Sequence, residues 1–167
     1  MIEALALNPV SSLVGVHHIG MTVANLENAL AFWEKFLGKP ARWTTVLDRP
    51  YLSRVVGYPG VSIRAAFIDL PAGGVIELLD YHQVKDRVVN SDATAHPGNV
   101  HLCLSVNDAG AAWAHAVSCG ARPVSHEGPV DIDGGPNKGS RAAYLRIHDG
   151  VTLELFQPAA ATERLSR

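Results

Sequence analysis

The stretch RAAYLRIHDGVTLELF, residues 141–156, repeats a pattern that the chain has already used once. Residues 64–79 read RAAFIDLPAGGVIELL, and the two segments align without a gap, 77 positions apart. Each combines an apolar run, a turn containing glycine and a second apolar run, which is the pattern of a β-hairpin. Each also places a glutamate, Glu77 or Glu154, in the middle of the second predicted strand.

A second pair of similar segments lies upstream of the two hairpins. VHHIGMTVANLENALAFWEKFLGKP, residues 16–40, aligns with NVHLCLSVNDAGAAWAHAVSCGARP, residues 99–123, and His18 falls on His101, 83 positions later. The two offsets are close, so one connecting loop differs in length between the copies. Self-similarity of this kind indicates a tandem duplication of one supersecondary unit.

Each copy predicts a strand, a helix and a closing hairpin. Period-two alternation favours a strand ahead of Asn25 and of Asp108, and a helical run follows each of these two capping residues. We therefore predict an α+β fold with a first module at residues 14–81, a linker at 82–97 and a second module at 98–158. The two modules together are expected to form one structural domain.

Composition and charge exclude several classes of protein. The chain has 167 residues, 47% of them hydrophobic, and its net charge of −2 without a basic cluster argues against a nucleic-acid partner. No apolar run approaches the roughly 20 residues of a membrane span, and the first residues lack the pattern of a signal peptide. Cys103 and Cys119 share no metal or redox spacing, so we expect a reducing, cytoplasmic environment.

Alternation within the strands brings four polar residues to one side of the sheets. Side chains of a strand point alternately to its two faces, so a polar residue between two buried apolar ones points away from the core. Glu77, for example, lies between Ile76 and Leu78. The residues expected to point away from the helices are His18, Glu77, His101 and Glu154.

These four residues predict a metal site. An ionised carboxylate on the inner face of a sheet is costly unless it is paired or bound to a cation. One divalent ion bound by two imidazoles and two carboxylates, one pair from each repeat, would offset the free energy of removing these carboxylates from water. Because no thiolate joins the set, Zn²⁺, Ni²⁺, Co²⁺, Mn²⁺ and Fe²⁺ all remain candidates.

The remaining histidines are predicted to have no part in the site. His17 alternates onto the helix side of its strand, so we expect a structural role there. Loops or the outer surface of a helix are expected to hold the others, which are His82, His96, His115, His126 and His148.

Several segments together resemble the vicinal oxygen chelate superfamily, which includes glyoxalase I, methylmalonyl-CoA epimerase, extradiol dioxygenases, and fosfomycin and bleomycin resistance proteins. The resemblance rests on VHHIGMTV, ALAFWEKFLG, GGVIELL, NVHLCLSV and GVTLELFQP. It implies two βαβββ modules that form an incomplete mixed-sheet barrel around a metal site, and it implies a homodimer. By position it also implies that the metal ligands of glyoxalase-type members correspond to His18, Glu77, His101 and Glu154.

Within the superfamily, the sequence resembles the epimerase-like branch. Glyoxalase I typically carries an Asn-Trp pair after its first glutamate ligand, whereas this chain continues as ELLDYHQ after Ile76. We therefore expect a metal-dependent isomerase, epimerase or lyase that acts on a small substrate with vicinal oxygens through a metal-chelated enolate. Glu77 or Glu154 would move the proton as the catalytic base.

Two other functions remain open. The first is an Fe²⁺ ring-cleaving dioxygenase, although such enzymes use two histidines and one carboxylate, and a second glutamate would fill room that dioxygen needs. The second is a ligand-binding or resistance protein, although members that only sequester a ligand lack the metal ligands that this chain retains.

Overall fold

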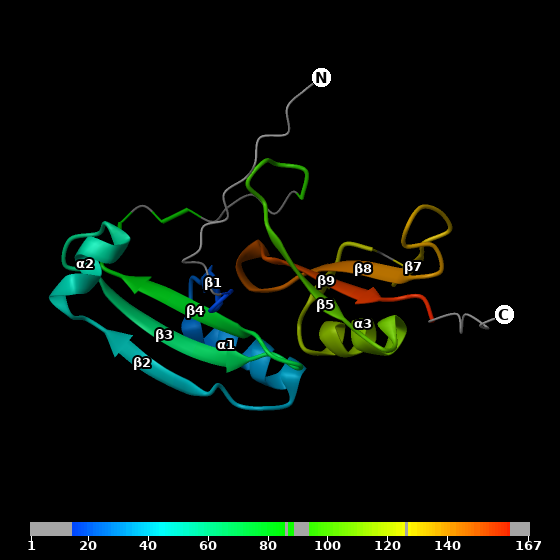
Figure 1. The fold of residues 1–167 in the computed structure, drawn as a ribbon. Helices are drawn as coiled ribbons and strands as arrows, with labels where there is room; N and C mark the ends of the chain where they lie inside the picture. The colour runs from blue at the N-terminus through cyan, green and yellow to red at the C-terminus, as the bar shows by residue number, and fades with distance from the viewer. Residues whose placement is uncertain (1–14, 86, 89–93, 126, 161–167) are drawn as a thin grey trace, which may run out of the picture.

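Two sheets, each accompanied by one long helix, lie next to each other (Figure 1). The computed structural model describes residues 15–85, 87–88, 94–125 and 127–160. The first module consists of β1 (Ile19–Thr22), α1 (Leu26–Leu37), β2 (Trp43–Leu47), α2 (Pro50–Val56), β3 (Ser62–Asp69) and β4 (Val75–His82). The second consists of β5 (His101–Ser105), α3 (Ala109–Ser118), β6 (Arg122–Pro123), β7 (Val130–Asp131), β8 (Arg141–Arg146), the short 3₁₀ helix η1 (His148–Gly150) and β9 (Thr152–Gln157).

The two sheets share one topology, which confirms the predicted α+β fold. Their strand orders are β1-β4-β3-β2 and β5-β9-β8-β6, with β7 paired to β8. The first strand of each module runs parallel to the last, and the predicted hairpins β3–β4 and β8–β9 are antiparallel. Within the described residues the sheets do not close on each other, which agrees with an incomplete barrel.

The predicted caps fix where the two long helices begin. The side chain of Asn25 accepts a hydrogen bond from the backbone N–H of Asn28 at 2.8 Å, and that of Asp108 accepts one from Ala111 at 3.0 Å. Gly38 ends α1 in the left-handed conformation, with φ of 68°, which glycine adopts without strain. None of the helices in the described part of the chain has the length and hydropathy of a membrane-spanning segment.

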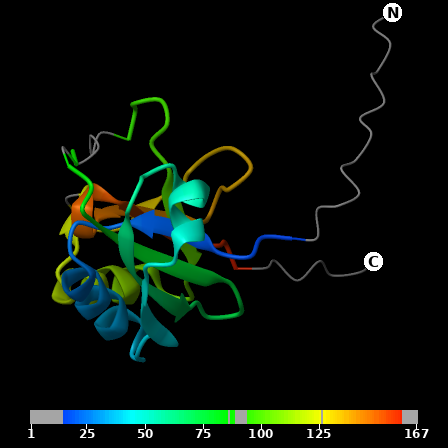
Figure 2. The same cartoon turned by 90° about the vertical axis from the view of Figure 1, so that its left-hand side faces the viewer.

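Helices α1 and α3 lie side by side on the same side of the two sheets (Figures 1 and 2). The ammonium group of Lys35 donates a hydrogen bond to the carbonyl oxygen of Ser118, and the rings of Phe36 and His115 stack with centroids 5.6 Å apart. One hydrophobic core runs through both modules, from Trp33 of α1 to Leu153 of β9. The two modules therefore fold as a unit around a shared core.

His148 is buried in the contact between the modules, so the prediction that it lies on the surface is wrong. Its side chain is only 8% exposed, and its Nε2 accepts a hydrogen bond from the indole N–H of Trp33 at 2.8 Å. The next residue, Asp149, accepts a hydrogen bond from the backbone N–H of Ala24 at 3.0 Å. The turn thus packs onto the other module, a tertiary contact that the local sequence pattern does not reveal.

Three of the other histidines are exposed as predicted, and they are His82, His96 and His115. His82 is the last residue of β4 instead of part of a loop or helix, so that part of its prediction is wrong. The exposed His115 also places its Nε2 3.0 Å from the carbonyl oxygen of Phe36 in the neighbouring module. His126 lies outside the described residues.

The environment of His148 makes the free energy of unfolding depend on pH. Burial lowers the pKa of His148, and the nearby carboxylate of Asp149 only partly opposes this effect. Because the imidazole binds its proton more readily in the unfolded chain, stability is fully present above the ordinary pKa of 6.5 and falls as the pH drops below it.

We predict that His148→Gln flattens this dependence, since glutamine retains an oxygen that can accept the Trp33 hydrogen bond but does not titrate. Urea unfolding at pH 7.5 and at pH 5.5 should show a smaller loss of unfolding free energy for the variant than for the wild type. His96→Gln, at an exposed histidine, is the matched control and should behave as the wild type. An unchanged loss in His148→Gln would contradict the assignment.

Candidate metal centre

The predicted ligands come together as two His–Glu pairs, one in each module. Nε2 of His18 lies 3.0 Å from Oε2 of Glu77, and Nε2 of His101 lies 2.9 Å from Oε2 of Glu154. The carboxylate side chains are 15% and 16% exposed, whereas the imidazoles are 34% and 43% exposed. Each carboxylate is therefore largely buried, and its imidazole partner is the more exposed member of the pair.

Strand register explains why each pair forms. Gly20 of β1 is the direct partner of Glu77 in β4, and His18, in the segment just before β1, reaches that carboxylate. Cys103 of β5 pairs with Glu154 of β9 in the same way, which brings His101 to the second carboxylate. The duplicated sequence thus produces duplicated geometry.

A single chain holds these pairs as two separate half-sites. Among the residues that the structure describes, no group of three or more His, Cys, Asp or Glu side chains is arranged to hold one metal ion. Each half-site offers one imidazole nitrogen and one carboxylate oxygen, a donor set that suits Zn²⁺, Ni²⁺, Co²⁺, Mn²⁺ or Fe²⁺. The four-ligand centre predicted from the sequence remains a prediction.

His17 lies beside the first half-site rather than against the helix, so its predicted position is wrong. Strand β1 begins only at Ile19, and the alternation used for the prediction does not extend back to His17. The residue is exposed, and its Nδ1 lies 2.8 Å from Nδ1 of His18. One of these nitrogens must donate to the other, which fixes the orientation of the His18 ring.

The two half-sites have different surroundings. In the second, Cys103 and Tyr144 flank Glu154 as its direct neighbours on adjacent strands. Burial raises the pKa of the Cys103 thiol to about 11, and the charge of Glu154 and its hydrogen bond to the thiol add to the rise. Burial followed by the charge of Glu154 raises the pKa of Tyr144 as well. Both groups therefore remain protonated beside this carboxylate at neutral pH.

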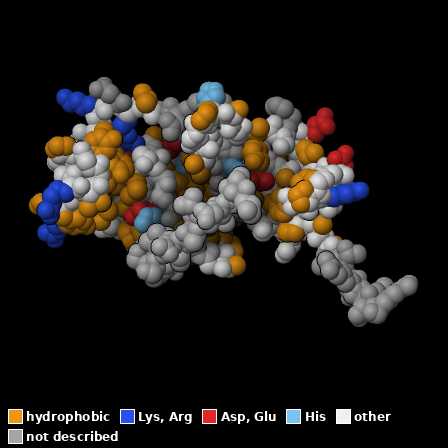
Figure 3. All heavy atoms as spheres, turned by 45° about the horizontal axis from the view of Figure 1, so that its top comes forward, with side chains coloured by type: hydrophobic (Ala, Val, Ile, Leu, Met, Phe, Trp, Pro, Cys, Tyr) orange, Lys and Arg blue, Asp and Glu red, His pale blue; other side chains and the backbone are white. Residues whose placement is uncertain are grey.

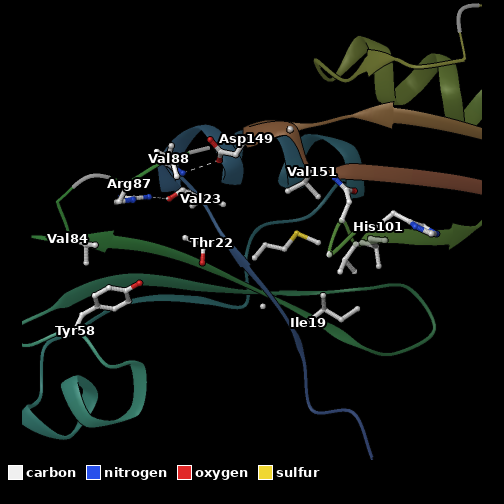
Figure 4. A pocket seen from close by; sticks show the side chains of 18 of the residues that line it. Ile19, Thr22, Val23, Tyr58, Val84, Arg87, Val88, His101, Asp149 and Val151 are labelled. Atoms are coloured by element: carbon white, nitrogen blue, oxygen red, sulfur yellow. Dashed lines mark hydrogen bonds between the residues drawn. The ribbon is translucent and has the colours of Figure 1, made fainter. Parts of the chain in front are cut away.

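A groove of about 840 Å³ separates the two modules along strand β1. His101 lies at one end of it and Tyr58 and Val84 at the other, while Arg87 donates a hydrogen bond to the carbonyl oxygen of Val23 (Figure 4). The carboxylates of the two half-sites are outside its lining. On the face in Figure 3, Lys and Arg side chains lie toward the two ends of the molecule, whereas hydrophobic and acidic side chains are spread from the middle to the ends.

We predict that Cys103 reacts slowly with thiol reagents because little thiolate is present. At pH 8, alkylation of Cys103 by iodoacetamide should be at least about tenfold slower than that of an unperturbed thiol. Peptide mass spectrometry measures the rate, and Cys119 serves as the internal reference. Glu154→Gln removes the nearby charge and should accelerate alkylation of Cys103 but not of Cys119. Equal rates at the two cysteines in the wild type would contradict the prediction.

Comparison with known proteins places this geometry in a family. The family model of the glyoxalase/bleomycin resistance protein/dioxygenase superfamily matches residues 17–144. A 2-epi-5-epi-valiolone epimerase from an Actinomyces species is 30% identical over 156 residues, which are 89% of this chain and 82% of that protein. The epimerase activity in this name is that of the relative.

Solved structures agree in fold. A glyoxalase family protein from Bacillus cereus superposes with a TM-score of 0.72 at 20% identity, over 94% of this chain and 100% of that one. A fosfomycin resistance protein from Listeria monocytogenes, crystallised with Mn(II) and sulfate, gives a TM-score of 0.53 at 15% identity, over 92% and 99% of the chains. Glyoxalase I from Zea mays gives 0.55 at 16% identity, over 86% of this chain and 44% of that one. With the family model spanning most of both modules, the chain belongs to the glyoxalase/bleomycin resistance protein/dioxygenase superfamily.

Proposed function

We propose that this protein is a divalent-metal-dependent epimerase or isomerase that moves a proton on a carbon next to a carbonyl group. The observation that carries the proposal is the repeated His–Glu pair, at 3.0 Å in one module and 2.9 Å in the other. The epimerase among the relatives supports this reaction class over a lyase or a dioxygenase. The substrate would be a small molecule with two vicinal oxygens.

The ion would be held by the two imidazoles and the two carboxylates of the half-sites. When bound, a divalent metal supplies Lewis acidity to the neighbouring oxygens of a substrate. The donor set fits such an ion, because each half-site offers a nitrogen and an oxygen at close range. The ligands in this proposal are His18, Glu77, His101 and Glu154.

The glutamates would also transfer the proton. A carboxylate oxygen of Glu77 or Glu154 accepts the proton as the C–H bond breaks, and the electron pair moves onto the carbonyl oxygen to give an enolate. The other glutamate starts as a carboxylic acid and gives its own proton to the opposite face of the same carbon as the electron pair returns there, so the stereocentre inverts and the two glutamates exchange protonation states. Both side chains are largely sheltered from solvent, which favours proton transfer to the substrate over exchange with bulk water.

We further propose that two copies of the chain complete the site, with the first half-site of one copy facing the second half-site of the other. Strands β1 and β5 are both open edges of their sheets, and unpaired edges are templates for association. Apolar side chains are exposed close to both edges: Val16 is 87%, Ile19 40% and Val100 80% exposed. A homodimer would cover these edges and bring two half-sites together.

Metal content tests the ligand assignment. We expect about one divalent ion per chain in the purified wild type, because the proposed homodimer contains two four-ligand sites, each built from one half-site of each copy. Both Glu77→Ala and His101→Ala should lose the ion, as measured by inductively coupled plasma mass spectrometry after dialysis against a weak chelator. Asp48→Ala, at a carboxylate outside the half-sites, is the control. A wild type that binds no metal even when supplied would sink the proposal.

Mixed dimers test whether the site is shared between chains. One variant carries His18→Ala with Glu77→Ala, the other His101→Ala with Glu154→Ala, and each alone should bind no metal. A mixed dimer with a shared site contains one intact centre and binds one ion, half the content of a wild-type dimer. Because random pairing makes about half of the dimers mixed, unfolding and refolding the two variants together should restore about a quarter of the wild-type metal content. If the mixture stays metal-free while refolded wild type regains its ion, the site is not shared in this way.

Hydrogen exchange tests the reaction. In D₂O, the metal-loaded protein should exchange the proton beside the carbonyl of 2-epi-5-epi-valiolone and form an epimer, both visible by proton NMR. Glu77→Gln and Glu154→Gln should each lower the rate at least about a hundredfold, the usual worth of a general base. Oxygen uptake with an iron-loaded protein and no exchange would instead indicate a dioxygenase.

A further inference from the structure

An aromatic pair lies in the same row of the first sheet as Glu77. Trp43 of β2 is the direct partner of Phe67 in β3, and Phe67 is the direct partner of Glu77 in β4. Directly paired residues of neighbouring strands point to the same face of a sheet. Both rings are therefore on the face that carries the first half-site.

The two rings form a supported platform beside this half-site. Their centroids are 4.4 Å apart and their planes differ by 23°, so the indole of Trp43 stacks on the ring of Phe67. Phe67 is only 9% exposed and its ring also meets the edge of His18, at a centroid distance of 5.6 Å. Trp43 is 37% exposed, so its indole keeps accessible surface two strands away from Glu77, in the same row of the sheet.

The platform lies outside the two hydrophobic clusters, although Phe67 itself is buried. Among the described residues, neither Trp43 nor Phe67 belongs to the two clusters of buried hydrophobic side chains, whereas Trp33 is fully buried in the larger one. The backbone just before β2 is bound to β3, since the N–H of Arg42 donates to the carbonyl oxygen of Phe67 at 2.7 Å. The indole of Trp43, stacked on Phe67 and partly exposed, is available to a ligand.

The second module does not repeat the platform, although it repeats the His–Glu pair. Tyr144 occupies the position of Phe67, and strand β6 contains only Arg122–Pro123, so no second aromatic ring stacks at the position of Trp43. Residue Val124 donates its backbone N–H to Tyr144 there instead. The stacked pair is therefore present in one of the two copies and absent at the equivalent, described position of the other.

We propose that Trp43, held by Phe67, is the specificity-determining residue of the site and recognises the flat face of a saturated six-membered ring. The C–H groups of such a ring pack on an indole face by dispersion and by attraction to its negative π surface. Two adjacent oxygens of the same ring would then be directed at the His18–Glu77 half-site. The substrate class is a cyclic hydroxyketone, and this assignment rests on the proposed function above.

Two matched probes separate ring recognition from oxygen binding. Both 2-hydroxycyclohexanone and acetoin carry a ketone beside a hydroxyl group, but only the first is cyclic. Dissociation constants are measured by calorimetry on the metal-loaded protein. For Trp43→Ala we expect 2-hydroxycyclohexanone to bind about tenfold more weakly, since an aromatic contact of this kind is lost, with acetoin changed less than about twofold. Trp43→Phe, which keeps a ring, should retain most of the preference.

Val46→Ala is the control variant, because Val46 is 56% exposed on the same edge strand but on its opposite face. It should bind both probes as the wild type does. Equal weakening of the two probes by Trp43→Ala, or no weakening, overturns the proposal, as does a wild type that does not prefer the cyclic probe. Weaker binding of catechol alone would assign the platform to an aromatic ring and also overturn it. Failure of the proposed function differs from all of these, since the wild type would then bind no metal.

Discussion

A carboxylate on the inner face of an apolar strand is the constraint around which this protein is arranged. Removing an ionised carboxylate from water costs several kcal/mol unless a partner compensates. In each module the partner is an imidazole at the start of the neighbouring parallel strand or just before it, at 3.0 Å or 2.9 Å. That pairing requires the first strand to lie directly against the last one, and a long crossover that begins with a helix makes this parallel arrangement possible. The topology and the candidate site therefore have the same cause.

Much of this arrangement could be predicted, because it depends on patterns that repeat locally. The hairpins and both helix caps follow from glycine, asparagine and aspartate at fixed offsets, and the faces of Glu77, His101 and Glu154 follow from strand alternation. The duplication strengthened the prediction, since Glu77 and Glu154 had to occupy equivalent environments. The structure brings each to its expected histidine.

The features that could not be predicted depend on contacts between distant segments. His148 is in a turn that would be solvated in isolation, and only the packing of η1 on α1 buries it against Trp33. His17 fails for the opposite reason: the strand begins later than the alternation suggested, so the periodic rule was applied outside the strand. The proposed sharing of one ion by two half-sites depends on how two copies associate. Strand periodicity predicts the faces within one chain and carries no information on contacts between chains.

The differences between the copies are as informative as the similarities. If the duplication served only to hold an ion, the positions around both His–Glu pairs would be free to stay alike. Instead, Gly20 and the stacked rings surround one pair, while Cys103 and Tyr144, both held protonated, surround the other. One side then offers apolar surface and the other offers weak hydrogen-bond donors. In the proposed site, a substrate bound between such unlike halves would have one preferred orientation. The proposed proton transfer requires this, because each glutamate would have to face a defined side of the reacting carbon.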